Sequence, residues 1–230
     1  LLDEALGVGR GLDLARPFAA PAPIAVFLDG FGNFGPGSHA AGSSLRGYDS
    51  TGVPVANNLS DVTYRVDRDG TLTFVNEAWN AFAILNDTPA LAGPAILGRR
   101  VADCIAGHET RLIYSQLLER AAAGVRIELT YRCDSPMLRR LMLLTVTATG
   151  REIEFRSQLV EVAMRPVVRL LEPERPRSTD LLTLCSWCNR GRLGDRWAEI
   201  EEVVAALGLF EAEVPRLSHG VCPDCQARIG

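Results

Sequence analysis

The sequence contains no lysine, because all 24 of its basic side chains belong to arginine. A Schiff-base lysine, a P-loop lysine and the phosphate-binding lysine of a protein kinase are therefore excluded within these 230 residues. Histidine is also scarce, with three scattered residues, and neither a Gly-x-Ser-x-Gly segment nor a recognisable pair of catalytic carboxylates is present. These absences predict that the chain is not an enzyme.

Long hydrophobic runs are absent as well. No apolar stretch approaches the roughly 18 residues that a membrane-spanning helix needs, and no signal peptide is legible. The net charge of −4 and the pI of about 5.5 give the chain no general attraction to nucleic acid or to anionic lipid. We therefore expect a cytoplasmic protein that does not bind membranes, with nucleic acid an improbable partner.

Cysteine is the residue type that carries the strongest signal. Two C-x-x-C pairs, Cys185 with Cys188 and Cys222 with Cys225, are separated by residues 189–221. One such turn brings two thiolates close enough to bind one ion, and two turns complete a tetrahedral shell of four sulfurs. Zinc suits that shell best, and four sulfurs leave no position for a reactive water. The pattern predicts a structural Zn²⁺ site.

Alternatives to a closed zinc site remain open. His219, three residues before Cys222, is a candidate substitute ligand or a residue that supports the ligands. The four cysteines also fit an iron–sulfur cluster, or a redox switch in which oxidation releases the metal. The remaining cysteines, Cys104 and Cys133, are interpreted as small core residues.

The hydrophobic pattern divides the chain into regions. Residues 1–58 are rich in Gly, Ala, Pro and Ser and are predicted to form a loosely ordered extension. Residues 59–170 show strand-like alternation, helical spacing and then alternation again, which indicates an α+β domain with helices on one face of an antiparallel sheet. The expected strands cover 62–67, 71–75, 126–133, 141–149 and 152–162, and the longest expected helix covers 109–123.

A charged, proline-containing stretch over residues 171–180 is predicted to be a linker, followed by a cysteine module over residues 181–228. In that module Trp197, Ile200, Val204 and Leu207 recur at helical spacing, which predicts a helix over residues 196–207. Its own core is small, so we expect the module to fold only with its metal and independently of the preceding domain.

The segment from about Asp61 to Val162 resembles a PAS domain. The resemblance is carried by Tyr64-Arg-Val-Asp67, Asp69-Gly70, Phe74-Val-Asn-Glu-Ala-Trp79, Gly98-Arg-Arg-Val-Ala-Asp103 and the helix that ends at Gly124. It implies a sensory domain that offers a small core pocket for a ligand of unknown identity, or a dimerisation surface. Haem-binding PAS domains carry a histidine on a comparable helix, but His108 stands about a turn too early to face a pocket.

The C-terminal segment resembles a short zinc-ribbon-like module of some bacterial signalling proteins with PAS domains. Its marks are Cys185-Ser-Trp-Cys188, Trp197 and Ser218-His-Gly-Val-Cys-Pro-Asp-Cys225. The two resemblances together imply a non-enzymatic bacterial sensory or scaffolding protein whose zinc module docks a protein partner.

Two further functions remain as alternatives. One is a zinc-dependent nucleic-acid-binding regulator, and the other is a haem or redox sensor. Arg132, Arg139 and Arg140 could bind an anion or nucleic acid, but a solvated hairpin loop with local ion pairs is the favoured interpretation.

Overall fold

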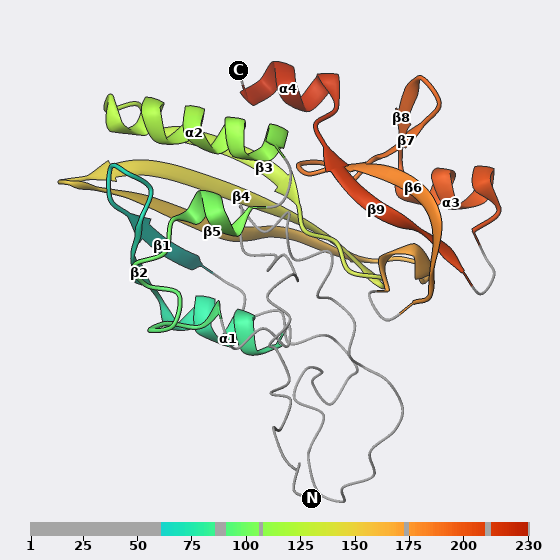
Figure 1. Cartoon of the computed structure of the whole chain (residues 1–230), viewed down its shortest axis with the longest axis horizontal. Helices are drawn as coiled ribbons and strands as arrows, with labels where there is room; N and C mark the ends of the chain where they lie inside the picture. Colours follow the sequence, from blue (N-terminus) through green and yellow to red (C-terminus); the bar gives the residue numbers. More distant parts are fainter. Residues whose placement is uncertain (1–60, 86–90, 106–107, 173–174, 210–212, 230) are drawn as a thin grey trace, which may run out of the picture.

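The computed structural model describes residues 61–85, 91–105, 108–172, 175–209 and 213–229 (Figure 1). The extension predicted over residues 1–58 lies outside this part of the chain. None of the described helices is long and apolar enough to cross a membrane.

The first region is built on a five-stranded antiparallel sheet. Its strands are β1 (Val62–Val66), β2 (Leu72–Val75), β3 (Ile127–Arg132), β4 (Leu138–Thr149) and β5 (Glu152–Met164). They lie in the order β2-β1-β5-β4-β3, and every neighbouring pair is antiparallel. The predicted mixed architecture with an antiparallel sheet is confirmed.

Local side-chain hydrogen bonds explain how the first elements begin and end. The Asp67 carboxylate accepts hydrogen bonds from the backbone N–H groups of Asp69 (3.0 Å) and Thr71 (2.8 Å), which closes the turn between β1 and β2. Asn76 then accepts a hydrogen bond from the N–H of Trp79 at 2.9 Å, as a helix N-cap does. Helix α1 (Glu77–Leu85) therefore starts directly after β2.

Helices α1 and α2 (His108–Ala122) pack on the same face of the sheet. Tyr64 on β1 meets the ring of Trp79 edge-on with centroids 5.2 Å apart, and its hydroxyl lies 3.2 Å from the hydroxyl of Tyr114 on α2. Phe155 stacks between the rings of Tyr64 (4.8 Å) and Tyr114 (5.7 Å). These buried rings occupy the space between the sheet and its helices. A short 3₁₀ turn, Val101–Cys104, belongs to this region, and a second one, Arg169–Leu171, follows β5 and packs with the C-terminal region.

The C-terminal region forms a second, four-stranded sheet (Figure 1). Its elements are β6 (Arg177–Cys185), β7 (Gly191–Leu193), β8 (Arg196–Ala198), α3 (Ile200–Leu207), β9 (Val214–Gly220) and α4 (Pro223–Ile229). The strand order is β8-β7-β6-β9, with β6 and β9 parallel and the other pairs antiparallel. Parallel neighbours need a long crossover connection, which the β7–β8 hairpin and α3 supply.

The predicted helix over residues 196–207 is wrong at its start. Trp197 lies on strand β8 opposite Arg192, after a turn in which Gly194 has φ of 60°. Helix α3 begins only at Ile200, so the 3-4-3 spacing that starts at Trp197 joins a strand residue to a helix. Strand β6 begins at Arg177, inside the stretch interpreted as a linker.

The two regions share a hydrophobic core, which overturns the expectation of separate cores. Cys185, Trp187, Cys222, Cys225 and Ile229 belong to the same buried cluster as the side chains between the five-stranded sheet and its helices. A second, smaller cluster is confined to the C-terminal part of the chain. It comprises Val168, Leu170, Leu171, Leu182, Leu184, Ala198, Ile200, Val203, Val204 and Val214.

Candidate metal centre

The two C-x-x-C turns begin at the carboxyl ends of two neighbouring parallel strands. Cys185 is the last residue of β6 and lies in register with Gly220, the last residue of β9, and Cys222 follows two residues later. Parallel strands end at the same edge of a sheet, so both turns start side by side. The long crossover between β6 and β9 accounts for the unusually wide spacing of the cysteine pairs.

Each turn has a local reason for its shape. In the first, the N–H of Cys185 donates to the carbonyl of Arg190 (2.8 Å), and the N–H of Asn189 donates to the carbonyl of Cys185 (3.0 Å). Asn189 has φ of 60°, a left-handed conformation that asparagine tolerates better than most residues. In the second, Pro223 opens helix α4, a position where its missing N–H costs nothing.

The structure brings the four cysteine sulfurs together. Their Sγ atoms all lie within 4.8 Å of one another, and the Sγ atoms of Cys188 and Cys222 are 3.6 Å apart. A tetrahedral site with metal–sulfur bonds of about 2.3 Å requires sulfurs about 3.8 Å apart. Cys188 is half-buried and the other three are buried, so the cluster could hold a metal ion with almost no exposure to water.

His219 is not a member of this cluster. It lies on β9 in register with Leu184, and the group that the described residues form consists of the four sulfurs.

The electrostatics of the cluster favour a bound cation. Hydrogen bonds from the thiols of Cys188 and Cys225, together with the N–H of Cys222 at 3.3 Å, lower the pKa of Cys185 and stabilise its thiolate. The Cys185 thiolate in turn raises the pKa of both Cys188 and Cys225. One thiolate thus opposes the ionisation of its neighbours, and a divalent ion would remove that opposition. The chemistry of the donor set fits a metal.

An arginine stands beside the sulfurs. The Nη2 atom of Arg228, on α4, lies 3.5 Å from the Sγ of Cys225. Arg190, two residues after Cys188, pairs with Asp224 (2.8 Å) and Glu199 (3.3 Å). A shell of four thiolates around a divalent ion carries a net charge of −2, so nearby guanidinium groups stabilise it.

The first C-x-x-C turn packs against the five-stranded sheet. The ring of Trp187 meets Tyr131 of β3 edge-on with centroids 6.3 Å apart, and its carbonyl accepts a 2.7 Å hydrogen bond from the N–H of Arg132. Ser186 also hydrogen-bonds Thr110 of α2 at 2.9 Å. Sequence patterns do not reveal these contacts, because each of them joins residues more than 50 positions apart.

The arginines near the β3–β4 connection form ion pairs, as expected, but Arg140 is buried and Arg132 is only slightly exposed, which corrects the expectation of a fully solvated loop; Arg139 stays partly exposed. Arg132 pairs with the fully buried Asp134, which also receives Arg165 at 3.1 Å. The buried Arg140 donates to the carbonyl of Cys133 at 2.7 Å, and Arg139 pairs with Glu201 at 2.7 Å.

This charge network also reaches the first turn of α3. Arg132 pairs with Glu199 at 3.2 Å, and Arg165 pairs with Glu201 at 3.4 Å. Burial raises the pKa of Glu201, but the hydrogen bonds from Arg139 and from its own backbone N–H, together with the charges of Arg139 and Arg165, outweigh that effect and lower the pKa. The network therefore joins the end of the five-stranded sheet to the C-terminal region.

The other singled-out residues lie away from the metal centre. His108 is the first residue of α2 and is exposed, so it does not reach the stacked rings of the core. Cys104 and Cys133 are buried, as expected of core residues. Burial raises the pKa of both thiols, that of Cys133 to about 11, so they stay protonated at neutral pH.

Comparison with solved structures finds a PAS domain. The PAS domain of the Cronobacter turicensis quorum-sensing receptor RpfR, in complex with BDSF, is similar to this chain, with 13% sequence identity and a TM-score of 0.33. The match covers 44% of this chain and 95% of that chain. No protein-family profile and no curated protein matches the sequence. At this TM-score the similarity carries no conclusion about the function of this chain.

Proposed function

We propose that this chain is a non-enzymatic bacterial sensory or scaffolding protein, in which a PAS-like domain and a zinc-bearing module act as one body. The zinc ion would be structural, and the module would dock a protein partner. The observation that carries the proposal is the cluster of four sulfurs within 4.8 Å of one another, formed where two parallel strands end. A metal ion held by four sulfurs has no open position for catalysis. The geometry of the four sulfurs does not by itself distinguish zinc from iron.

The position of the cluster supports a scaffolding role. Its first loop contacts β3 through Trp187 and α2 through Ser186, and its second loop leads into α4. A metal ion bound there would hold both loops, and with them the C-terminal region, against the five-stranded sheet. Metal binding and the orientation of the two regions would therefore be linked.

Metal analysis of the purified protein tests the zinc assignment. We expect one zinc per chain by mass spectrometry of the metal content, no iron, and no absorption band in the visible spectrum. Cys222→Ser should lose the zinc, whereas Cys104→Ala, which removes a buried thiol outside the cluster, should keep it. If the protein contains iron and absorbs in the visible range, the bound group is an iron–sulfur cluster or haem and the zinc assignment is wrong. A native protein that contains no metal would refute the proposal.

A further inference from the structure

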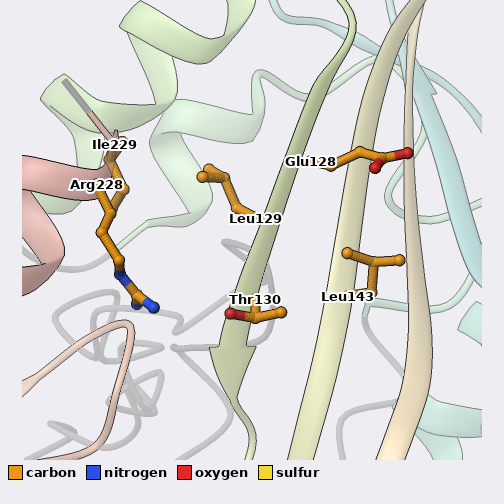
Figure 2. Close-up of a pocket in the computed structure, with 6 residues that line it drawn as sticks. All are labelled: Glu128, Leu129, Thr130, Leu143, Arg228 and Ile229. Carbon is orange, nitrogen blue, oxygen red and sulfur yellow. The ribbon is translucent and has the colours of Figure 1, made fainter.

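A groove runs along the free edge of the five-stranded sheet, between β3 and α4 (Figure 2). It has a cavity volume of about 300 Å³. Six residues line it: Glu128, Leu129, Thr130, Leu143, Arg228 and Ile229. The volume is at the lower end of the range for ligand pockets, about 300–1,000 Å³. It suits a short segment of chain better than a large cofactor.

The lining residues place the groove on the edge itself. Leu129 is paired with the buried Leu144 and shares the core face of the sheet. Thr130 is paired with Leu143, and these two side chains share the opposite face. A groove lined from both faces of β3 must wrap around its outer edge, and Figure 2 shows Arg228 and Ile229 on the side to which Leu129 projects.

The backbone of this edge offers hydrogen-bonding groups. The N–H of Cys133 donates to Arg140 on β4, and the N–H of Arg132 donates away from β4, to the carbonyl of Trp187. Successive residues of a strand alternate in this respect, so the N–H and C=O groups of Glu128 and Thr130 point outward as those of Arg132 do. Among the described residues, β3 pairs with β4 alone, which leaves these groups without a strand partner.

From these observations we propose that the β3 edge binds an extended peptide of a partner protein that carries an acidic side chain. The proposal deepens the proposed function, because it rests on the docking role of the zinc module and names where and what the module docks. The peptide would add a strand beside Glu128 and Thr130. Its acidic side chain would meet the exposed guanidinium of Arg228, and an apolar neighbour would contact Leu129 and Ile229.

A peptide fits this edge better than a second copy of the chain. Helix α4 lies beside β3, so an incoming strand must enter between the two elements. A second copy that paired its own β3 with this edge would bring its own α4 to the same edge. A single extended segment brings no such helix.

The metal centre would control this groove. Cys225 lies on α4, three residues before Arg228, and Arg120 of α2 donates to the carbonyl of Ile229 at 2.9 Å. The loop that contains Trp187 closes one end of the edge at Arg132. Loss of the metal would release α4 and that loop together, and so remove one wall and one end of the groove.

Peptide binding to the full chain tests the proposal. The probe is an array of acetylated six-residue peptides of alternating valine and threonine with glutamate, glutamine or lysine at the third position. We expect the glutamate peptides to bind at least tenfold more tightly than the lysine peptides. In solution, a bound glutamate peptide should slow amide hydrogen exchange at Glu128 and Thr130 and leave Leu129 unchanged. No binding above that of glycine–serine peptides would overturn the proposal.

Two variants and their controls locate the interaction. Thr130→Pro removes one outward N–H without touching the β3–β4 ladder and should weaken binding at least tenfold, whereas Thr130→Ala should bind as the native chain does. Arg228→Gln should bring the affinities for the glutamate and glutamine peptides to within about twofold. Equal binding by Thr130→Pro and the native chain would overturn the proposal, as would a dimer of the native chain that Thr130→Pro dissociates.

Zinc content, measured in every sample, separates this proposal from the proposed function. Thr130→Pro should keep its zinc while it loses the peptide. If the native chain binds the peptide but contains no zinc, the proposed function and the control of the groove by the metal both fail, and the peptide site remains. If it contains zinc and binds no peptide, the groove proposal fails alone.

Discussion

In the five-stranded sheet, the rings of Tyr64, Phe155 and Tyr114 stack between strands and helices, whereas the C-terminal region meets that sheet through Trp187, in the first loop of the four-cysteine cluster, and through a network of arginines and carboxylates. Burial of apolar rings stabilises the first region without a bound ion and without a neighbouring region. Buried thiolates and ion pairs are stable only when every charge is compensated. The first region can therefore be stabilised by its own apolar burial, whereas we expect the C-terminal region to depend also on a bound metal and on its neighbour.

Removal of the metal centre should have the largest effect, because it should destabilise the C-terminal region and leave most of the five-stranded sheet intact. Structural zinc contributes of the order of 10 kcal/mol to small domains, so Cys222→Ser should expose β6 to α4 to fast amide hydrogen exchange. Because Tyr131 packs on Trp187, protection should also fall in β3, while β1 and β5 keep theirs. Cys104→Ala serves as the control. Unchanged protection around Trp197 would show that the C-terminal region does not need the metal.

Loss of one buried carboxylate is expected to have the next largest effect. Asp134 is fully buried and pairs with Arg132 and Arg165, so Asp134→Asn leaves these guanidinium groups with only their more exposed partners, Glu199 at 3.2 Å and Glu201 at 3.4 Å. We expect a loss of about 3–5 kcal/mol in the free energy of unfolding, measured by urea denaturation. Asp195→Asn, on an exposed turn, should change it by less than about 0.5 kcal/mol. Equal effects of the two changes would mean that the network adds little.

A single methyl group tests the packing of the C-terminal region itself. A Cβ atom at Gly191 would lie 2.9 Å from Cγ2 of Val203, a stiff side chain on α3. Gly191→Ala should therefore cost about 1–3 kcal/mol in the free energy of unfolding. Val203→Ala makes room for the new methyl group, so the cost of Gly191→Ala should fall in the Val203→Ala background. Equal costs in both backgrounds would contradict the predicted clash.

Acid should loosen the contact between the regions slightly. The pKa of Glu201 is lowered from its ordinary value of 4.5, so its contribution is present above about pH 4.5 and is lost as the pH falls through the folded pKa. Glu201→Gln should cost about 0.2–1 kcal/mol near pH 7 and less at pH 3, as urea denaturation at both values would measure. A difference between the two proteins that grows toward pH 3 would reverse the assigned sign.

The antiparallel sheet could be predicted from sequence because its signals are local. Alternation along β1, β4 and β5, and the turn at Asp69-Gly70, lie within short windows. The C-terminal sheet could not, because β6 begins in a charged, proline-containing stretch that indicates a linker, and its parallel partner lies far along the chain. Trp197 was assigned to a helix because helical spacing ignores the turn at Gly194.

The candidate metal centre was predictable in composition but not in its surroundings. Two C-x-x-C pairs identify the four sulfurs without reference to the fold. The contact between Tyr131 and Trp187, and the burial of Asp134 among arginines, join residues whose proximity depends on how the two sheets meet. No short sequence pattern predicts how the two sheets pack against each other.

The parallel pairing of β6 and β9 sets which changes of length the metal centre can absorb. Residues added at the exposed turn of Gly194 and Asp195 lengthen only the crossover, and the register of Cys185 with Gly220 stays as it is. Deletion of one residue within β9 instead shifts that register and turns alternate side chains to the opposite face. The distance in sequence between the cysteine pairs is therefore free to vary, and the alignment of the two strand ends is not.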